Sequence, residues 1–284
     1  MEITLDLIKE LRNKTGAGIA DCKKALVEND GDIQKAIEDL RKKGAATALK
    51  RADKATNEGA VKAKISDDRK FGAIIELTCE TDFVSRGNDF QSLSDRVAEA
   101  AFNAKTNDVE KVLSSKTTNN LTVKEDIDSV VSSVAEKVEL RRVATMECAD
   151  GFICEYIHFG SKLGSLVAIK GKLTPESEAL GKSIAMQVVA MSPMAIDRKG
   201  ISDEIMAKEK EIYLEAAKNE GKKADIAERI TSNKVEKFYQ DNCLIEQESI
   251  KESGRSVQEL MNDYKKKSGE ALEVVDMIRF HIGG

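Results

Sequence analysis

The chain contains very few of the residues on which most active sites and aromatic cores are built. Of its 284 residues none is Trp, two are Pro and two are His, and aromatic residues make up only 4%. With His158 and His281 alone, there is little basis for a histidine-based catalytic triad or a metal cluster. We therefore expect a core built from Ala, Val, Ile and Leu, and we predict no cofactor.

Cysteine pairs and long apolar runs are also missing. The five cysteines are scattered and form no C-x-x-C pair, which indicates reduced, buried thiols rather than a zinc site or a disulfide framework. No apolar run reaches the length of a membrane span, and the first residues lack the pattern of a signal peptide. The net charge of −5 gives no general reason to bind nucleic acid. We therefore expect a cytoplasmic protein that binds neither membranes nor nucleic acid directly.

What the chain does contain is charge (33% of residues) and clear periodicity, beginning with a helical N-terminal region. Apolar residues at helical spacing predict three short helices within residues 1–54, separated by tight glycine turns. We predict a compact module of the ubiquitin-associated (UBA) type, a kind that usually binds another protein. The basic segment over 41–54 is predicted to be a solvated helix face and linker. Arg12, Ile19 and Ala20 lie at its loop edges, where they are either ordinary surface residues or contact residues.

Residues 55–140 change to a mixed pattern, which predicts a first core subdomain. Thr122 and Glu125 have the spacing of a capping box at the start of a helix. The elements expected here are a strand from Gly59 to Ile65, a buried strand at 71–79, and helices at 90–104 and 122–138.

A second, related subdomain is predicted from residues 141–195 and 241–284, so the expected fold class is α+β. Its expected elements are strands at 142–147, 151–158, 164–172 and 274–282, a helix opened by Pro175, and a helix at 257–264. Residues 196–240 consist mostly of helix formers with a narrow apolar stripe. They predict an antiparallel helical hairpin, or coiled coil, inserted in this subdomain as an arm for partner or self contact.

The most unusual position is Phe83, within Thr81-Asp82-Phe83-Val84 directly after the buried strand. Cap-forming residues end the strand, and Gly87 can end a single helical turn, with Asn88 and Gln91 as caps for the next helix. A large ring on this short turn either folds back into the core or points towards a partner. Composition alone favours the core, because most Phe side chains are largely buried.

A search for nucleotide or catalytic motifs favours a binding protein over an enzyme. Residues 180–183 (LGKS) resemble the end of a phosphate loop. However, Glu176 stands where the first glycine is needed, and Pro175 places the segment inside a helix. The sequence therefore predicts no nucleotide site of its own.

Two longer motifs, in order along the chain, resemble the translation elongation factor Ts family. They are residues 11–18 (LRNKTGAG) with 21–26 (DCKKAL), and residues 81–84 (TDFV); a His-x-Gly segment at 158–160 also matches. The resemblance implies a partner, elongation factor Tu, on which the protein promotes exchange of GDP for GTP without an active site of its own. It also implies a homodimer or a 2:2 complex. A structural or chaperone-like adaptor is the alternative.

The resemblance also implies roles for single residues. Thr81, Asp82, Phe83 and Val84 would enter the partner and displace support for its Mg²⁺, which reverses the composition-based interpretation of Phe83. The residues implied to contact the partner elsewhere are Leu11, Arg12, Ile19, Ala20 and His158. Ile19-Ala20 stand where the family often has two Met, and the chain shows no match to a further C-terminal helix found in some members.

Overall fold

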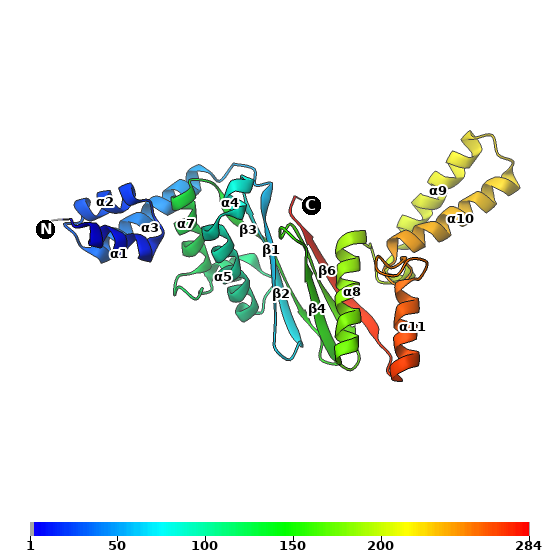
Figure 1. The fold of residues 1–284 in the computed structure, drawn as a ribbon. Coiled ribbons are helices and arrows are strands. Elements are labelled where there is room, and N and C mark those ends of the chain that lie inside the picture. The colour runs from blue at the N-terminus through cyan, green and yellow to red at the C-terminus, as the bar shows by residue number, and fades with distance from the viewer. Residues whose placement is uncertain (1–2, 284) are drawn as a thin grey trace.

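Two three-stranded antiparallel sheets pack face to face at the centre of the molecule in the computed structural model, which describes residues 3–283 (Figure 1). The first sheet has the order β1-β2-β3, with β1 (Glu58–Ile65), β2 (Phe71–Cys79) and β3 (Val138–Glu147). The second has the order β4-β5-β6, with β4 (Gly151–Ile157), β5 (Leu163–Lys170) and β6 (Glu273–His281). The expected α+β class is therefore confirmed.

The central strand β2 is buried on both faces, which explains why it reads as a continuous apolar run. Ile74 points into the cluster between the sheets, and Ile75 points into the cluster beneath the helices of the first sheet. Those helices are α4 (Asp82–Arg86), α5 (Asn88–Ala104), α6 (Val109–Ser114) and α7 (Val123–Val134). On the second sheet, α8 (Pro175–Met191) and α11 (Val257–Ser268) pack against the other side. The centre is thus a helix–sheet–sheet–helix stack.

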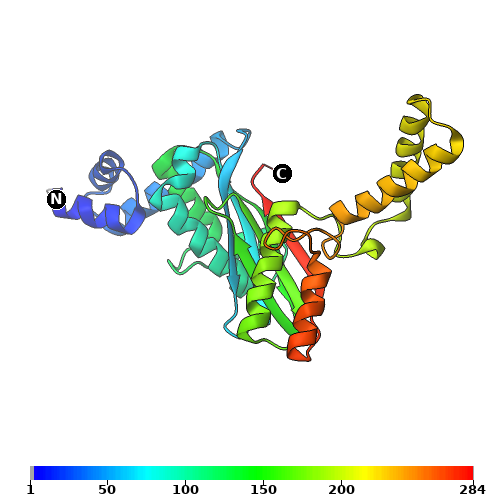
Figure 2. The same cartoon turned by 45° about the vertical axis from the view of Figure 1, so that its right-hand side comes forward.

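A three-helix module forms one end of the molecule, as Figures 1 and 2 show in blue. It consists of α1 (Leu5–Thr15), α2 (Ile19–Glu28) and α3 (Ile33–Lys50) around a small apolar cluster. The side chains of Thr4 and Asp32 cap α1 and α3. Gly16 ends α1 in the left-handed region at φ 69°, where a glycine is least strained. The three predicted helices are present; the UBA-like assignment stays a prediction.

The third helix is longer than expected and joins the module to the core. Residues 41–54 were predicted as a solvated helix face and linker; α3 does continue to Lys50, but it packs along α7. Gly44 lies at the closest point, because a Cβ there would be 2.6 Å from the backbone oxygen of Asp128. The alanine-rich composition of the segment therefore serves close helix packing as well as solvent exposure.

The predicted boundary between the two subdomains falls inside a strand. Helix α7 ends at Val134, and its C-cap Ala135 adopts a left-handed conformation at φ 55°. Val138 therefore begins β3 and is not part of a helix over 122–138. The strand predicted at 142–147 is the second half of β3, and it pairs with β2 instead of joining the second sheet. The Thr122–Glu125 capping box is confirmed.

Two smaller expectations differ from the structure. Gly87, not Asn88, is the N-cap of α5, and it has no side chain with which to cap. The Gln91 amide instead donates to the backbone oxygen of Ser85 at 2.6 Å. Helix α6 was not predicted; it begins after Asp108, whose carboxylate accepts from the backbone N–H groups of the first turn.

The helical hairpin projects from the end opposite the module (Figures 1 and 2). It consists of α9 (Asp203–Asn219) and α10 (Ala224–Asn242), which pack against each other, and follows a short 3-10 turn, η1 (Arg198–Gly200). Its base is held by Arg198, whose guanidinium lies 2.8 Å from Glu236 and 2.7 Å from Glu246. The chain then returns through α11 to β6, so the hairpin is an insertion before the last strand of the second sheet.

Candidate functional site

The segment Thr81–Val84 forms a rigid corner where β2 ends; we call it the corner. Thr81 is the N-cap of α4, and its hydroxyl accepts the backbone N–H of Val84 at 3.4 Å. Helix α4 has only five residues. A helix of this length is unstable on its own in water, so its shape depends on contacts with the rest of the protein.

Phe83 is the most exposed residue of the corner, with 86% of its surface accessible. The expectation from composition, that this ring folds into the core, is therefore wrong. Val84 is half-buried and packs against the cluster beneath α5, so it anchors the side of α4 that faces the protein. An aromatic ring left this exposed gains nothing for its own fold, which is typical of a contact residue.

Asp82 lies beside Phe83 in the first turn of α4 and is half-buried. Its carboxylate lies 3.3 Å from the guanidinium of Arg86 one turn later. The hydroxyl of Ser85 donates to the backbone oxygen of Asp82 at 3.1 Å. The corner thus presents an acidic group and an aromatic ring side by side on a backbone with several local hydrogen bonds.

Two carboxylates, Glu80 and Glu136, connect the corner to neighbouring elements, and the sequence alone predicted neither contact. Glu136 accepts hydrogen bonds from the backbone N–H of Thr81 at 3.0 Å and from its hydroxyl at 2.8 Å. Glu80 accepts from the backbone N–H of Lys137 at 2.6 Å and from two nitrogens of Arg51 at 2.7 Å each. The Arg51 guanidinium holds the pKa of Glu80 below its usual value. These contacts connect the corner to the end of α3 and to the connection after α7.

Beneath the corner, Cys79 is fully buried at the end of β2. Burial raises the pKa of its thiol to about 12, and the thiol donates to the backbone oxygen of Thr81 at 3.3 Å. It is therefore protonated at neutral pH and contributes packing, not reactivity.

The predicted contact residues of the N-terminal module divide into two groups. Arg12, Ile19 and Ala20 are exposed, with Ile19 58% accessible at the start of α2. Leu11 is fully buried in the cluster between the three helices. Leu11 therefore supports the module from inside and offers no surface to a partner, because α1 turns this position inward together with Ile8.

His158 is exposed on the turn between β4 and β5, where its ring nitrogen Nδ1 lies 3.0 Å from the hydroxyl of Tyr156. This turn is tied to β1, since the backbone N–H of Val61 donates to the oxygen of Ser161 at 2.6 Å. Helix α4 also packs on β1. Although about 75 residues apart in the chain, the corner and the His158 turn therefore border the same strand.

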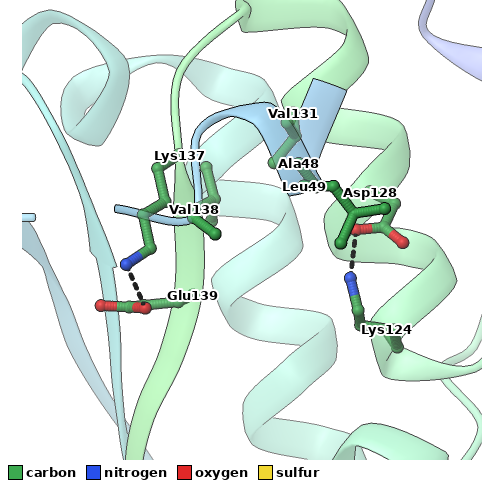
Figure 3. Close-up of a pocket in the computed structure, with 9 residues that line it drawn as sticks. Ala48, Leu49, Lys124, Asp128, Val131, Lys137, Val138 and Glu139 are labelled. Atoms are coloured by element: carbon green, nitrogen blue, oxygen red, sulfur yellow. Dashed lines mark hydrogen bonds and ion pairs between the residues drawn. The ribbon is translucent and has the colours of Figure 1, made fainter. Parts of the chain in front are cut away.

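Two cavities lie near these elements. The smaller, of about 260 Å³, lies between α3, α7 and the start of β3. Figure 3 shows the ion pairs at its rim, Lys137–Glu139 at 2.8 Å and Lys124–Asp128 at 2.6 Å, with apolar side chains between them. Its charged groups are already paired with one another. We therefore interpret this cavity as a gap in the packing between the helices and β3, not as a ligand site.

The larger cavity, of about 490 Å³, lies between the module and helices α5 and α7. Its walls include the ion pair of half-buried Arg96 and buried Asp126, joined at 2.7 and 2.8 Å. The hydroxyl of Ser129 also donates to the backbone oxygen of Thr15 at 2.9 Å, which fastens the module to α7.

Within residues 3–283, no cluster of three or more His, Cys, Asp or Glu side chains is placed to bind a metal ion. In the same range, no helix has the length and apolarity needed to cross a membrane.

The fold and the exposed residues define a class of protein: an α+β molecule with exposed apolar and charged residues on several separate elements. Comparison with known proteins identifies the family. The model of the family described as Elongation factor TS matches residues 80–284. Elongation factor Ts of Chlorobium phaeobacteroides is 40% identical, and that of Chlorobaculum tepidum 42% identical, each over 99% of both chains. That of Clostridium botulinum is 37% identical over 99% of this chain and 93% of its own. The chain belongs to the elongation factor Ts family, a family of translation elongation factors.

Proposed function

We propose that this protein binds elongation factor Tu in its GDP-bound form and promotes release of GDP, so that GTP can bind. The observation that carries the proposal is the exposed ring of Phe83 on a corner that is otherwise held rigidly. A backbone that is already fixed brings the ring to the partner without first being ordered, so less conformational entropy is lost on binding.

In the proposed mechanism, Asp82 and Phe83 enter the nucleotide-binding domain near its Mg²⁺ site. The metal bridges the nucleotide phosphates and the GTPase, and it balances much of the local charge. Displacing the groups that support the metal leaves the GDP phosphates poorly neutralised. GDP then dissociates faster, although this chain contributes no reacting group of its own.

The other exposed residues would hold the protein in place while the corner acts. Arg12, Ile19 and Ala20 would dock on the same domain of the partner, and His158 on another. Binding of the exchange factor and binding of GDP weaken each other reciprocally, and a coupling of about 4 kcal/mol changes affinity roughly a thousandfold. Only contacts that differ between the two states of the partner contribute to that coupling. As a translation factor of this kind, the protein would act in the cytoplasm as an exchange factor without an active site of its own.

The test is release of labelled GDP from elongation factor Tu, with and without this protein. We expect Phe83→Ala to slow stimulated release by about tenfold or more, because a buried aromatic anchor at an interface contributes about 2 kcal/mol or more. The thermal stability of the free protein should change little, since the ring is exposed.

Val275→Ala is the matched control, because Val275 is an apolar residue 46% exposed on β6 of the other sheet. It should leave GDP release unchanged. Full stimulation by the Phe83→Ala variant would remove this ring from the mechanism.

A structural or chaperone-like adaptor is the second candidate, and exposed apolar residues on the hairpin favour it. Ile212 on α9 is 56% exposed and Ile226 on α10 is 38% exposed, far from the corner. An adaptor would bind elongation factor Tu, or a second copy of this chain, without changing the rate of GDP release. The same assay on the unaltered protein therefore separates the two functions.

A further inference from the structure

We propose that Glu136 is a positioning residue for the corner: it holds Thr81 so that α4 keeps its shape and Phe83 keeps its direction. Neither the family motifs nor the proposed function assigns a role to this residue. The effect on GDP release rests on the proposed function, whereas the effect on the corner does not.

The corner needs such support because the Phe83 ring has few contacts with the rest of the protein. With 86% of its surface exposed, Phe83 has few contacts that could fix its direction. Its direction must come from the backbone of α4, and a five-residue helix is not stable alone. The N-cap of α4 is Thr81, whose hydroxyl accepts the backbone N–H of Val84.

Glu136 accepts from both hydrogen-bond donors of Thr81 at once. One carboxylate oxygen accepts the backbone N–H at 3.0 Å and the other accepts the hydroxyl at 2.8 Å. Since the hydroxyl proton is committed to Glu136, a lone pair of the same oxygen remains for the N–H of Val84. Hydrogen bonds to an ionised carboxylate are stronger than neutral ones, so this contact sets the geometry of the cap.

Glu136 is itself held in place by its neighbours in the chain. Ala135 ends α7 in the left-handed region at φ 55°, which turns the chain towards the corner. The next residue, Lys137, donates its backbone N–H to Glu80 at 2.6 Å and pairs through its side chain with Glu139 at 2.8 Å. The segments 80–81 and 136–137 are thus joined by three hydrogen bonds, and each segment supplies one accepting carboxylate. These bonds fix the backbone at the start of α4, from which the Phe83 side chain projects.

The first test measures the corner directly, in the free full-length protein, by amide hydrogen exchange. In Glu136→Ala, exchange at Val84 and Ser85 should become about tenfold faster, as expected for loss of charge-assisted hydrogen bonds. Amides in the middle of β2 should stay as protected as in the unaltered protein. Glu136→Gln keeps one acceptor oxygen and should give an intermediate rate. Unchanged exchange at Val84 and Ser85 in both variants would overturn the proposal.

The second test is a double-mutant cycle read by release of labelled GDP from elongation factor Tu. Glu136→Ala alone should lower the maximal rate of stimulated release by about tenfold, with a smaller change in the concentration needed for half-maximal effect. In a protein that already carries Phe83→Ala, Glu136→Ala should cost no further activity, because its effect passes through the ring. Equal losses in both backgrounds would show an independent role and overturn the proposal.

Controls separate this proposal from the proposed function. Glu147→Ala removes an exposed glutamate at the opposite end of β3 and should change neither readout. If the unaltered protein fails to stimulate GDP release, the proposed function fails, while the exchange result at Val84 still decides the role of Glu136. If the unaltered protein stimulates release and Glu136→Ala does so equally well, only the positioning role fails.

Discussion

At the scale of single residues, Gly44 determines how closely the helix of the N-terminal module approaches the core. A Cβ at this position would lie 2.6 Å from a backbone oxygen of α7, closer than real side chains are found. The neighbouring hydrogen bond from Ser129 to the oxygen of Thr15 depends on the same approach. The absence of a side chain at Gly44 therefore permits the close contact through which the module is attached to α7.

We predict that Gly44→Val lowers the free energy of unfolding by about 1–3 kcal/mol, because α3 must move away from α7 to admit the side chain. Ala46→Val, at an exposed position of the same helix, is the control and should change it by about 0.5 kcal/mol or less. Denaturant unfolding followed by circular dichroism measures both. Equal stability of the two variants would show that the helix contact is looser than the structure indicates.

Residues joined by local patterns were predicted from the sequence, and residues joined only by the fold were not. Thr122 and Glu125 are three positions apart, so their capping box follows from spacing alone. Thr81 and Glu136 are 55 positions apart, and nothing in either local sequence indicates the contact. Leu11 and Ile19 are both apolar residues in helical segments, and only packing of the three helices decides that one is buried and the other exposed.

At the scale of elements, the contact between the end of α3 and the end of β2 should make the fold sensitive to acid. Arg51 lowers the pKa of Glu80 in the folded protein, so folding favours the ionised carboxylate. The stabilisation is complete above the usual glutamate pKa of 4.5 and is lost as the pH falls through the lower, folded-state value.

We therefore predict that Glu80→Gln lowers the melting temperature at pH 7 and makes the melting temperature fall less steeply on acidification below 4.5, the usual glutamate value. The measurement is thermal unfolding over a pH series, with Glu147→Gln as the control. An unchanged slope in Glu80→Gln would show that other carboxylates account for acid sensitivity.

The strands and helices themselves followed largely from periodicity, but their pairing did not. Val134 and Val138 are four positions apart, which suits a helix, so the pattern extended α7 into β3. Only three residues separate β3 from β4, a spacing typical of a hairpin. The two strands belong to opposite sheets, because the chain crosses between the layers at residues 148–150. Such a crossing depends on which strands are buried between the two sheets. A short stretch of sequence does not contain that information.

At the scale of the whole molecule, the hairpin projects from the core, and its base is held by hydrogen bonds that do not involve α9 or α10. The backbone of residues 195–196 accepts hydrogen bonds from Leu244 at 2.9 Å and from Ile245 at 3.1 Å. These bonds hold the two ends of the insertion side by side. The second sheet should therefore not depend on the arm that projects from it.

We predict that replacing residues 203–241 by a short Gly-Ser linker leaves both sheets folded. Amide hydrogen exchange should show β5 and β6 as protected as in the unaltered protein, while circular dichroism loses the helical signal of α9 and α10. Loss of protection in β6 would show instead that the hairpin is needed to complete the second sheet.

The position of the hairpin before β6 has a consequence for how the chain is made. The first sheet is complete once Glu147 has left the ribosome, but β5 must wait for its outer neighbour until residues 273–281 are synthesised. That interval is about 100 residues, or roughly 5–20 s at typical elongation rates. During it the free edge of β5 is open to pairing with other nascent chains. A translation factor of this design is thus exposed to aggregation during its own translation, and slow elongation through the hairpin would lengthen that exposure.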